Sequence, residues 1–267
     1  MISVVCVYND EQTLQDCLLQ CLRSQTASCE LIALDNTESR FRSAAEALNY
    51  GGGRAHGKYV MFVHQDVSLN GDTWMRDAEN VLDSLPELGV AGIAGKRKKN
   101  EWLSNSKHGT PPRPAGSETL GAPVVVQTVD ECLVVVPREV FDVLKFDEAV
   151  CDGWHLYAVD YCLSSASIGL KTYVLPLPVY HSSEGAVDVP THLLDQLTAN
   201  IPASHRGNLS PDYYKTLKKL LKKHRNQTPR VYTTFRDWTT AYPIIVQRVA
   251  FVVVQIVNSV RTRLYCV

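Results

Sequence analysis

The sequence predicts an α/β protein built on a mostly parallel central sheet that is flanked by helices. Short apolar runs alternate over the first 180 residues with stretches whose apolar residues recur at helical spacing. Apolar residues make up 45% of the chain and charged residues 21%, which is ordinary for a globular domain. Asn9, Asp35 and Asp66 each follow closely on an apolar run, at the strand ends where such sheets bind ligands.

The first hundred residues carry the clearest element signals. Asn9 is expected to cap the first helix, and Gln12 to complete its capping box. Strands are expected over Ile2–Tyr8, Leu31–Leu34, Tyr59–Val63 and Val90–Ala94, and helices around residues 14–22, 41–50 and 73–85.

The remaining chain divides into a long polar segment, further α/β elements and a tail. Residues 96–121 hold three prolines and several glycines, which predicts a long loop. Strands are expected over residues 124–129, 132–136 and 172–180, with a helix over 156–166. We therefore expect an α/β domain at residues 1–184 and a helical C-terminal extension at residues 185–267.

Charge and cysteine content limit the function classes. The net charge of -1 gives no global support for nucleic-acid binding, so none is expected. The eight cysteines form no CxxC pair and lie mostly in apolar runs, which predicts free thiols in a reducing compartment. Cys17 and Cys21 are expected to pack in the core rather than to bind metal. With no secretory leader and no run of about 18 apolar residues, we expect a cytoplasmic protein.

The stretch from residue 49 to 66 carries the strongest functional signal. Glycines 51–53 let backbone approach a ligand closely, and the strand that follows ends in His64-Gln65-Asp66. The segment resembles the family-2 glycosyltransferases, whose pattern Asn-x-Gly-x-x-x-Ala-x-Gly-x-Tyr precedes an apolar strand that ends in Asp-x-Asp. The matching residues are Asn49, Gly51, Ala55, Gly57, Tyr59 and Asp66.

This resemblance covers about residues 1–183. It implies the GT-A fold of nucleotide-diphospho-sugar transferases, with a metal-dependent transfer of sugar from a nucleotide donor to a hydroxyl acceptor. The nucleoside is most often uridine in the family. The acceptor is expected to be a glycan or a lipid-linked molecule.

The resemblance also implies a divalent metal ion at Asp66, where it would stabilise charge on the leaving diphosphate. The first aspartate of the motif is His64 here, and imidazole suits Mn²⁺ better than Mg²⁺, so Mn²⁺ is the preferred ion and Mg²⁺ the second choice. His64 is either a ligand or a packing residue. His181, at the end of the last strand, is either a further ligand or a structural histidine.

Donor-binding candidates follow from the same resemblance. The residues after the first two strands would contact the base and ribose. Asp130 and Glu131 lie in a segment similar to one that lines the donor sugar, or they end a strand. The full set is Tyr8, Asn9, Asp35, Asn36, Asn49, Gly57, Gln65, Asp130, Glu131 and Trp154.

Residues 153–160 resemble the family's acceptor segment, in which a Glu-Asp pair usually opens a helix. The pair is Val159-Asp160 here, so Asp160 is the candidate general base, with Asp152 and Glu131 as rivals. Attack opposite the diphosphate implies inversion of configuration. Trp154 either stacks on an acceptor sugar or fills the core.

The C-terminal extension predicts two helices with unusual faces. Lys215–Arg225 is a basic amphipathic helix, and Ile244–Thr262 has no acidic residue and a wide apolar arc. Such helices dock on the domain or a partner, or lie on an anionic membrane surface, here the inner face of the membrane.

Other nucleotide-binding classes fit less well. A sugar nucleotidyltransferase would carry a glycine-rich basic loop after the first strand, and a dinucleotide oxidoreductase would carry GxGxxG there. The sequence has Tyr8-Asn9-Asp10-Glu11 at that point. A non-catalytic sugar-nucleotide or glycan-binding module with a degenerate transferase fold remains open, because His64 and Val159 depart from the family pattern.

Overall fold

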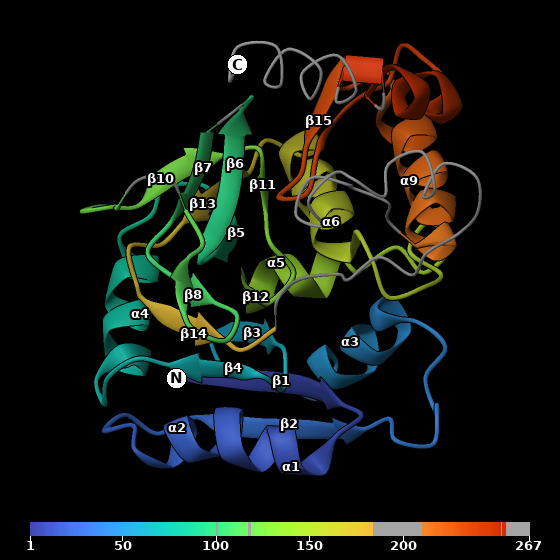
Figure 1. Ribbon diagram of the computed structural model, residues 1–267. Coiled ribbons are helices and arrows are strands. Elements are labelled where there is room, and N and C mark those ends of the chain that lie inside the picture. The colour runs from blue at the N-terminus through green and yellow to red at the C-terminus, as the bar shows by residue number, and fades with distance from the viewer. Residues whose placement is uncertain (100, 117–118, 184–209, 252, 255–267) are drawn as a thin grey trace, which may run out of the picture.

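A seven-stranded sheet forms the centre of the molecule (Figure 1). The computed structural model of this 267-residue chain describes residues 1–99, 101–116, 119–183, 210–251 and 253–254. The strand order is β10-β13-β5-β12-β3-β1-β2. The strands are β1 (Ile2–Tyr8), β2 (Glu30–Asp35), β3 (Tyr59–Val63), β5 (Leu88–Gly92), β10 (Val124–Val126), β12 (Leu133–Pro137) and β13 (Lys171–Val174).

The sheet is mostly parallel, as expected, since five of its seven strands run in one direction and β12 and β10 run in the other. β1 pairs in parallel with β2 and β3, and β5 with β13, but β12 runs antiparallel to both β3 and β5 between them. The direction of β12 was not predicted, because this strand is apolar and buried along its whole length and has the same pattern in either direction. The α/β class itself is confirmed.

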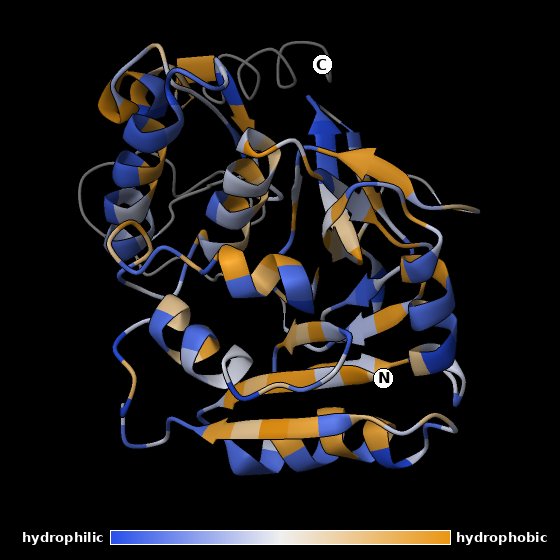
Figure 2. Cartoon of the chain, turned by 180° about the vertical axis from the view of Figure 1, so that it is seen from behind, coloured by the Kyte–Doolittle hydropathy of each residue, from blue (hydrophilic) through white to orange (hydrophobic). Residues whose placement is uncertain are grey.

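Helices cover both faces of the sheet, because successive strand residues point to opposite sides. Val5, Phe62 and Val134 pack under one set of helices, while Val4 and Met61 pack under the other. Figure 2 shows the apolar residues along the strands and on the inward faces of the helices. The first face carries α3 (Ala44–Gly52), α5 (Arg138–Val143) and α6 (Tyr157–Ser167); the second carries α1 (Glu11–Leu14), η1 (Gln15–Leu19), α2 (Gln20–Arg23) and α4 (Trp74–Asp83).

The first helix begins one residue later than its expected cap implied. Asp10 is the cap, and its carboxylate accepts the Thr13 backbone N–H at 3.0 Å. Asn9 instead bonds to Gln65 at the end of β3. The side chain of Asn9 therefore belongs to the edge of the sheet where the strands end.

The long loop expected over residues 96–121 is wrong. Asn105 explains why, because its side chain bonds to the backbone of Leu120 and to the Pro176 carbonyl oxygen, partners that local pattern does not reveal. The region contributes β6, β7, β8 and β9 to two smaller sheets, which have the strand orders β11-β6-β7 and β4-β14-β8-β9. The strands of these two sheets are β4 (Val67–Leu69), β6 (Ala94–Lys98), β7 (Glu101–Ser104), β8 (Lys107–His108), β9 (Arg113–Pro114), β11 (Thr128–Val129) and β14 (Val179–His181).

The described part of the extension docks on the α/β domain. Leu217 and Leu220 of α9 (Pro211–His224) pack against Leu163 of α6 in one buried cluster. A hairpin of β15 (Arg230–Tyr232) and β16 (Asp237–Thr239), which was not expected, contacts the domain through the partly buried Lys96–Asp237 ion pair at 2.5 Å. A further helix begins at residue 244.

Residues 184–209 lie outside the described residues, so the domain boundary at 184 stays a prediction. Residues 252 and 255–262 of the expected last helix also lie outside them. No helix among the described residues is long and apolar enough to cross a membrane.

Candidate active site

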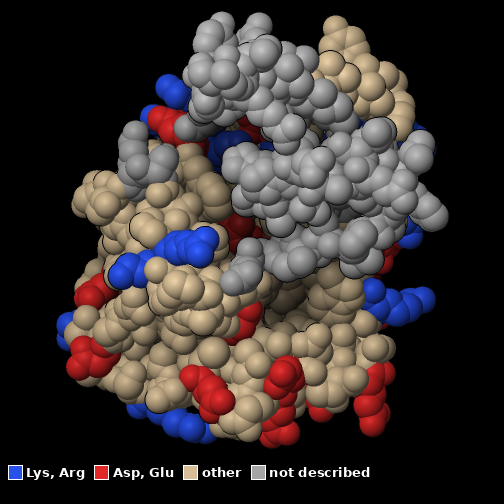
Figure 3. Space-filling view, viewed as in Figure 1, with Lys and Arg blue, Asp and Glu red and all other residues tan. Residues whose placement is uncertain are grey.

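A cleft of 610 Å³ opens where β1, β2 and β3 end, at the edge that the sequence predicts. The residues after these strands meet α3 and the start of α6 around it. The lining residues are Val7, Tyr8, Asn9, Asn36, Thr37, Ser39, Ala44, Leu48, Phe62, Val63, His64, Gln65, Asp66, Trp154 and Tyr157. This described lining includes neither lysine nor arginine. In Figure 3, acidic side chains are spread along the lower edge of the molecule.

Three candidate metal ligands converge at the cleft, two of them in its lining and His181 next to these two. One ligand atom each from His64, Asp66 and His181 lies within 4.8 Å of the others. His64 and Asp66 follow β3 directly, while His181 ends β14. β14 pairs with β4, which places His181 opposite Val67. Strand register therefore brings together residues that are far apart in the sequence.

The electrostatics of this cluster fit a bound cation. Burial lowers the pKa of His64, and His181 lowers it further, which keeps the imidazole neutral as a metal ligand requires. Burial disfavours the charged forms of Asp66 and His181. The interaction between the two side chains outweighs burial, so the pKa of Asp66 is lowered and that of His181 is raised.

His181 Nε2 is the unexplained atom of the cluster. It lies 3.2 Å from Asp66 Oδ1, yet this buried nitrogen has no partner in hydrogen-bond geometry among the described residues. Buried polar atoms are nearly always hydrogen-bonded, so this nitrogen, whose described contact is the ion pair with Asp66, is available to a metal ion when the imidazole is neutral. Two imidazoles and one carboxylate form a donor set suited to Mn²⁺.

The nucleoside end of the cleft is built from turns after β1 and β2. The Asp35 carboxylate accepts bonds from the backbone N–H of Thr37 at 2.8 Å and from its hydroxyl at 2.7 Å. Asn36 accepts the Phe41 N–H through its side chain. Asp35 therefore shapes the turn, and the cleft wall itself is formed by Asn36, Thr37 and Ser39.

Asn9 and Gln65 lock the ends of β1 and β3 together. Gln65 Oε1 accepts the backbone N–H of Asn9 at 2.9 Å, and its amide donates to Asn9 Oδ1 at 2.8 Å. Tyr8 lines the cleft beside them. Amides that hold each other in this way present a fixed polar surface to a ligand.

Trp154 lies at the cleft with 40% of its surface exposed, so it does not fill the core. The segment that carries it ends at Leu156, which is buried and has the left-handed backbone angle φ 65°. Such a conformation is strained for leucine and persists only where the surrounding structure holds it. The backbone then enters α6 at Tyr157, whose hydroxyl lies 3.0 Å from His64 Nε2.

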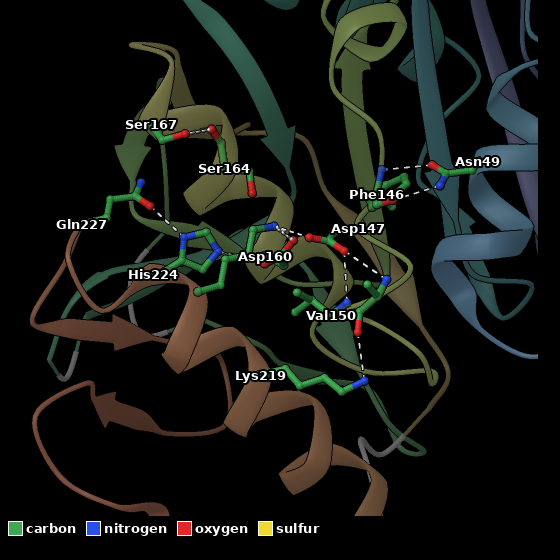
Figure 4. A network of polar contacts seen from close by, with 12 residues as sticks. Asn49, Phe146, Asp147, Val150, Asp160, Ser164, Ser167, Lys219, His224 and Gln227 are labelled. Atoms are coloured by element: carbon green, nitrogen blue, oxygen red, sulfur yellow. Dashed lines mark hydrogen bonds and ion pairs between the residues drawn. The ribbon is translucent and has the colours of Figure 1, made fainter.

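Asp160, the expected general base, lies elsewhere. Its carboxylate is 2% exposed and is bound by two residues of α9, Lys223 Nζ at 2.7 Å and His224 Nε2 at 2.8 Å (Figure 4). The expectation failed because a place in the first turn of a helix does not specify which face carries the side chain. The rival Asp152 is likewise bound, by Lys215 at 2.7 Å and Lys219 at 2.8 Å.

Glu131 is the rival that remains near the cleft. Its carboxyl oxygen Oε1 is buried without a hydrogen-bond partner among the described residues, and its carbonyl oxygen accepts the Tyr157 hydroxyl. Burial raises the pKa of Glu131 to about 8, helped by Asp130 and opposed by backbone N–H groups at the start of α6. Asp130 is satisfied by the Cys132 N–H and by the Thr234 hydroxyl at 2.7 Å.

Two expected donor contacts have structural roles instead. Asn49 donates to the Phe146 carbonyl oxygen and to Glu148, which ties α3 to a distant segment. Gly57 precedes β3, at the opposite end from His64, where a Cβ would lie 2.7 Å from the Met1 carbonyl oxygen. A shared motif therefore does not imply a shared contact with the donor.

The glycines of the motif also serve packing. A Cβ on Gly51 would lie 2.4 Å from Val5 Cγ1, and one on Gly52 equally close to Phe141 Cζ. Both glycines thus allow α3 to approach the sheet rather than a ligand.

Sequence reasoning missed Thr37, Ser39 and Tyr157 in the cleft wall. The first two continue the polar run after Asp35-Asn36, which is a usable signal. Tyr157 gives no such signal, because an aromatic residue at the start of an apolar helix predicts core packing.

A layered sheet of this order, with a candidate metal site where β3 and β14 end, matches the GT-A class of folds. The chain belongs to the glycosyltransferase-like family, whose sequence model matches residues 3–187. A Fuscovulum blasticum protein named ATP synthase subunits region ORF 6 is 27% identical over 153 residues. The match spans 54% of this chain and 59% of that protein, which is less than two thirds of its length.

Solved structures support the fold. The mannosyltransferase PcManGT from Pyrobaculum calidifontis, in complex with GDP-Man and Mn²⁺, is 12% identical with a TM-score of 0.50, covering 85% of this chain and 75% of that one. S. aureus TarS 1-349, in complex with UDP-GlcNAc, is 13% identical with a TM-score of 0.50, covering 85% and 73%. At these identities the likeness shows the fold alone.

Proposed function

We propose that this protein transfers a sugar from a nucleoside diphosphate donor, UDP-sugars foremost, to a hydroxyl acceptor with inversion. The observation that carries the proposal is the cluster of His64, Asp66 and His181, of which His64 and Asp66 line the cleft. Similar folds hold nucleotide sugars, one of them with Mn²⁺.

The charge of the cleft supports metal dependence. A leaving diphosphate gains negative charge, and the described lining has no lysine or arginine to offset it. A divalent ion, Mn²⁺ in preference to Mg²⁺, would supply Lewis-acid stabilisation at this point. His64, Asp66 and His181 would hold it.

The roles of the remaining residues follow from their places. Tyr8, Asn9, Asn36 and Gln65 would bind and orient the nucleoside, with Asp35 shaping the turn. Trp154 offers an exposed aromatic face on which an acceptor sugar can stack.

Glu131 replaces Asp160 as our candidate for the general base. Asp160 and Asp152 are ion-paired with lysines of α9, whereas Glu131 has no ion pair among the described residues and has one buried carboxyl oxygen without a hydrogen-bond partner. A carboxylate with a pKa near the working pH is suited to removing the proton of an attacking hydroxyl. The bond from the Tyr157 hydroxyl to the Glu131 carbonyl oxygen supports this proposal, because Tyr157 lines the cleft.

Ligand-dependent stabilisation tests the donor and metal roles. UDP or a UDP-sugar should raise the melting temperature in Mn²⁺ but not in EDTA, by the equivalent of about 2.7 kcal/mol at 100 times Kd. Asp66→Asn should abolish this effect, and the exposed Asp16→Asn should keep it. Equal stabilisation of the wild type with and without metal would contradict the metal site.

Product analysis separates the enzyme from a non-catalytic module. Release of the donor sugar, or its transfer to an added acceptor, supports the enzyme. Metal-dependent binding without turnover of any nucleotide sugar would favour the binding module.

We also propose that the extension meets an anionic membrane on its cytoplasmic side, where a lipid-linked or glycan acceptor would be presented. The helix from residue 244 directs polar side chains toward the protein and apolar side chains toward solvent. Gln247 bonds to Thr239, and Arg248 lies over the Tyr214 ring. Ile245 and Val249 are 60% and 52% exposed. The neighbouring helix α9 exposes Lys218, Lys222 and Arg225. An apolar strip with nearby basic residues fits an anionic lipid surface.

Vesicle co-sedimentation tests this surface. Full-length protein should sediment with phosphatidylserine vesicles in low salt, and less as salt screens the charges. Ile245→Ser with Val249→Ser should reduce sedimentation, whereas the exposed Val143→Ser on α5 should not. Equal sedimentation of both variants would overturn the proposal.

A further inference from the structure

We propose that Tyr157 is a positioning residue that fixes the tautomer of His64, so that His64 offers Nδ1 to the metal ion. The inference rests on the proposed metal site and deepens it, because it names the ligating atom and the residue that selects it.

The hydroxyl of Tyr157 lies between two partners. It donates to the Glu131 carbonyl oxygen at 3.0 Å, and it lies 3.0 Å from His64 Nε2. A carbonyl oxygen can only accept, so the single phenolic proton is used there. The lone pair of the hydroxyl then faces Nε2, and this nitrogen must carry the proton of the bond.

The consequence for the metal follows from the chemistry of imidazole. A neutral imidazole has one N–H, and a metal ligand must be neutral with a free lone pair. With Nε2 protonated, the lone pair of His64 is on Nδ1. A partner that fixes the tautomer also fixes the ring orientation, which raises metal affinity.

Tyr157 is itself held firmly enough for this role. Its side chain is buried, and its ring packs edge-on against Phe146 with centroids 5.8 Å apart. The His64 ring packs in turn against His181, with centroids 5.6 Å apart. These two edge-on ring pairs are joined by the contact of the Tyr157 hydroxyl with His64 Nε2, which links α6 to the ligand cluster.

The first test compares two tyrosines of α6. Tyr157→Phe removes the hydroxyl, and Mn²⁺ affinity measured by calorimetry should fall about 10- to 100-fold, as for other outer-shell partners. Tyr161→Phe is the matched control, because this buried hydroxyl, one turn on, donates to the Leu144 carbonyl oxygen and touches no histidine. The control should keep wild-type affinity for Mn²⁺.

The second test reads the ligating nitrogen directly and does not depend on how Tyr157→Phe folds. The amide of asparagine reaches the position of Nδ1, and that of glutamine reaches the position of Nε2. His64→Asn should therefore retain more Mn²⁺ affinity than His64→Gln, which should resemble His64→Ala.

The outcomes separate this inference from the proposed function. A wild-type protein that binds no Mn²⁺ contradicts the metal site itself. If the wild type binds Mn²⁺, unchanged affinity in Tyr157→Phe overturns the inference, and so does a His64→Gln variant that binds better than His64→Asn.

Discussion

Two aspartate–histidine clusters of this molecule contain similar residue types, but the hydrogen bonds are complete in one and incomplete in the other. At the α6–α9 contact, both oxygens of Asp160 are taken by Lys223 and His224, and His224 Nδ1 faces Gln227 Oε1 at 2.7 Å (Figure 4). At the cleft, Asp66 lies beside His181 without hydrogen-bond geometry, and His181 Nε2 is left without a partner among the described residues.

The difference teaches how to tell a structural cluster from a ligand site. Residue types do not separate the two, since each combines a buried aspartate with histidine. The hydrogen bonds separate the two clusters. A network in which every polar atom has a partner has no atom left to bind a ligand, whereas an incomplete network has an atom that still lacks a partner. Substitutions in each cluster test this contrast.

The largest effect should come from breaking the closed cluster. Asp160→Asn leaves Lys223 and His224 without their carboxylate, and losing one partner of a buried ion pair costs about 3–5 kcal/mol. Denaturant unfolding should show this loss, while the folded fraction binds nucleotide and Mn²⁺ normally. Asp66→Asn should show the reverse, with little loss of stability and no metal binding. Loss of turnover in Asp160→Asn without loss of stability would break the comparison.

Glu131 provides a second test of the contrast, because we propose a catalytic role for its carboxyl group, which has one oxygen without a hydrogen-bond partner. Glu131→Gln should lower turnover about 100-fold or more, equivalent to roughly 2.7 kcal/mol, with donor affinity retained. Wild-type turnover should rise with pH and level off above about 8, because the base acts only when deprotonated. The exposed Glu139→Gln is the control, and a variant at position 131 with wild-type turnover excludes the role.

The raised pKa of Glu131 also predicts how the free energy of unfolding changes with pH. A folded pKa of about 8, above the ordinary value of 4.5, means that the native state holds its proton more tightly than the unfolded state. The free energy of unfolding should therefore contain a term that falls as pH rises from about 4.5 to 8. This term should be absent from Glu131→Gln, as pH-dependent denaturation can show.

The smallest effect should come from Lys223→Met, which opens the closed cluster only in part. His224 still binds Asp160, and the lysine side chain is 30% exposed, so solvent screens some of its interaction. We expect a loss of about 1.5 kcal/mol, the lower end for a hydrogen bond to a charged group. A loss as large as that of Asp160→Asn would mean that Lys223, not His224, holds the cluster together.

The sequence predicted the site best where local pattern determines position. Tyr8, Asn36 and Asp66 follow strands with clear apolar patterns, and parallel strands that end at one edge bring them together. The direction of β12 and the strands within residues 96–121 were not predictable, because they depend on partners distant in the sequence.

Asp160 shows the same limit at the scale of one residue. Its helix was predicted correctly, but the partners of its carboxylate, Lys223 and His224, lie more than 60 residues later in the sequence. His181 shows the favourable case, since its place at a strand end made it a candidate ligand and the structure brings it next to Asp66. Spacing in the sequence thus identified candidates, and only the tertiary contacts separated ligands from structural ions.

The placement of His181 has a consequence for how the domain holds together. β3, which positions His64 and Asp66, belongs to the large sheet, whereas β14 belongs to the small sheet β4-β14-β8-β9. Anything that binds all three side chains is a crosslink between two sheets. A slip of β14 by one residue against β4 would turn His181 to the opposite face and break that crosslink. Metal affinity is therefore also a measure of strand register, and chelation should loosen the small sheet first.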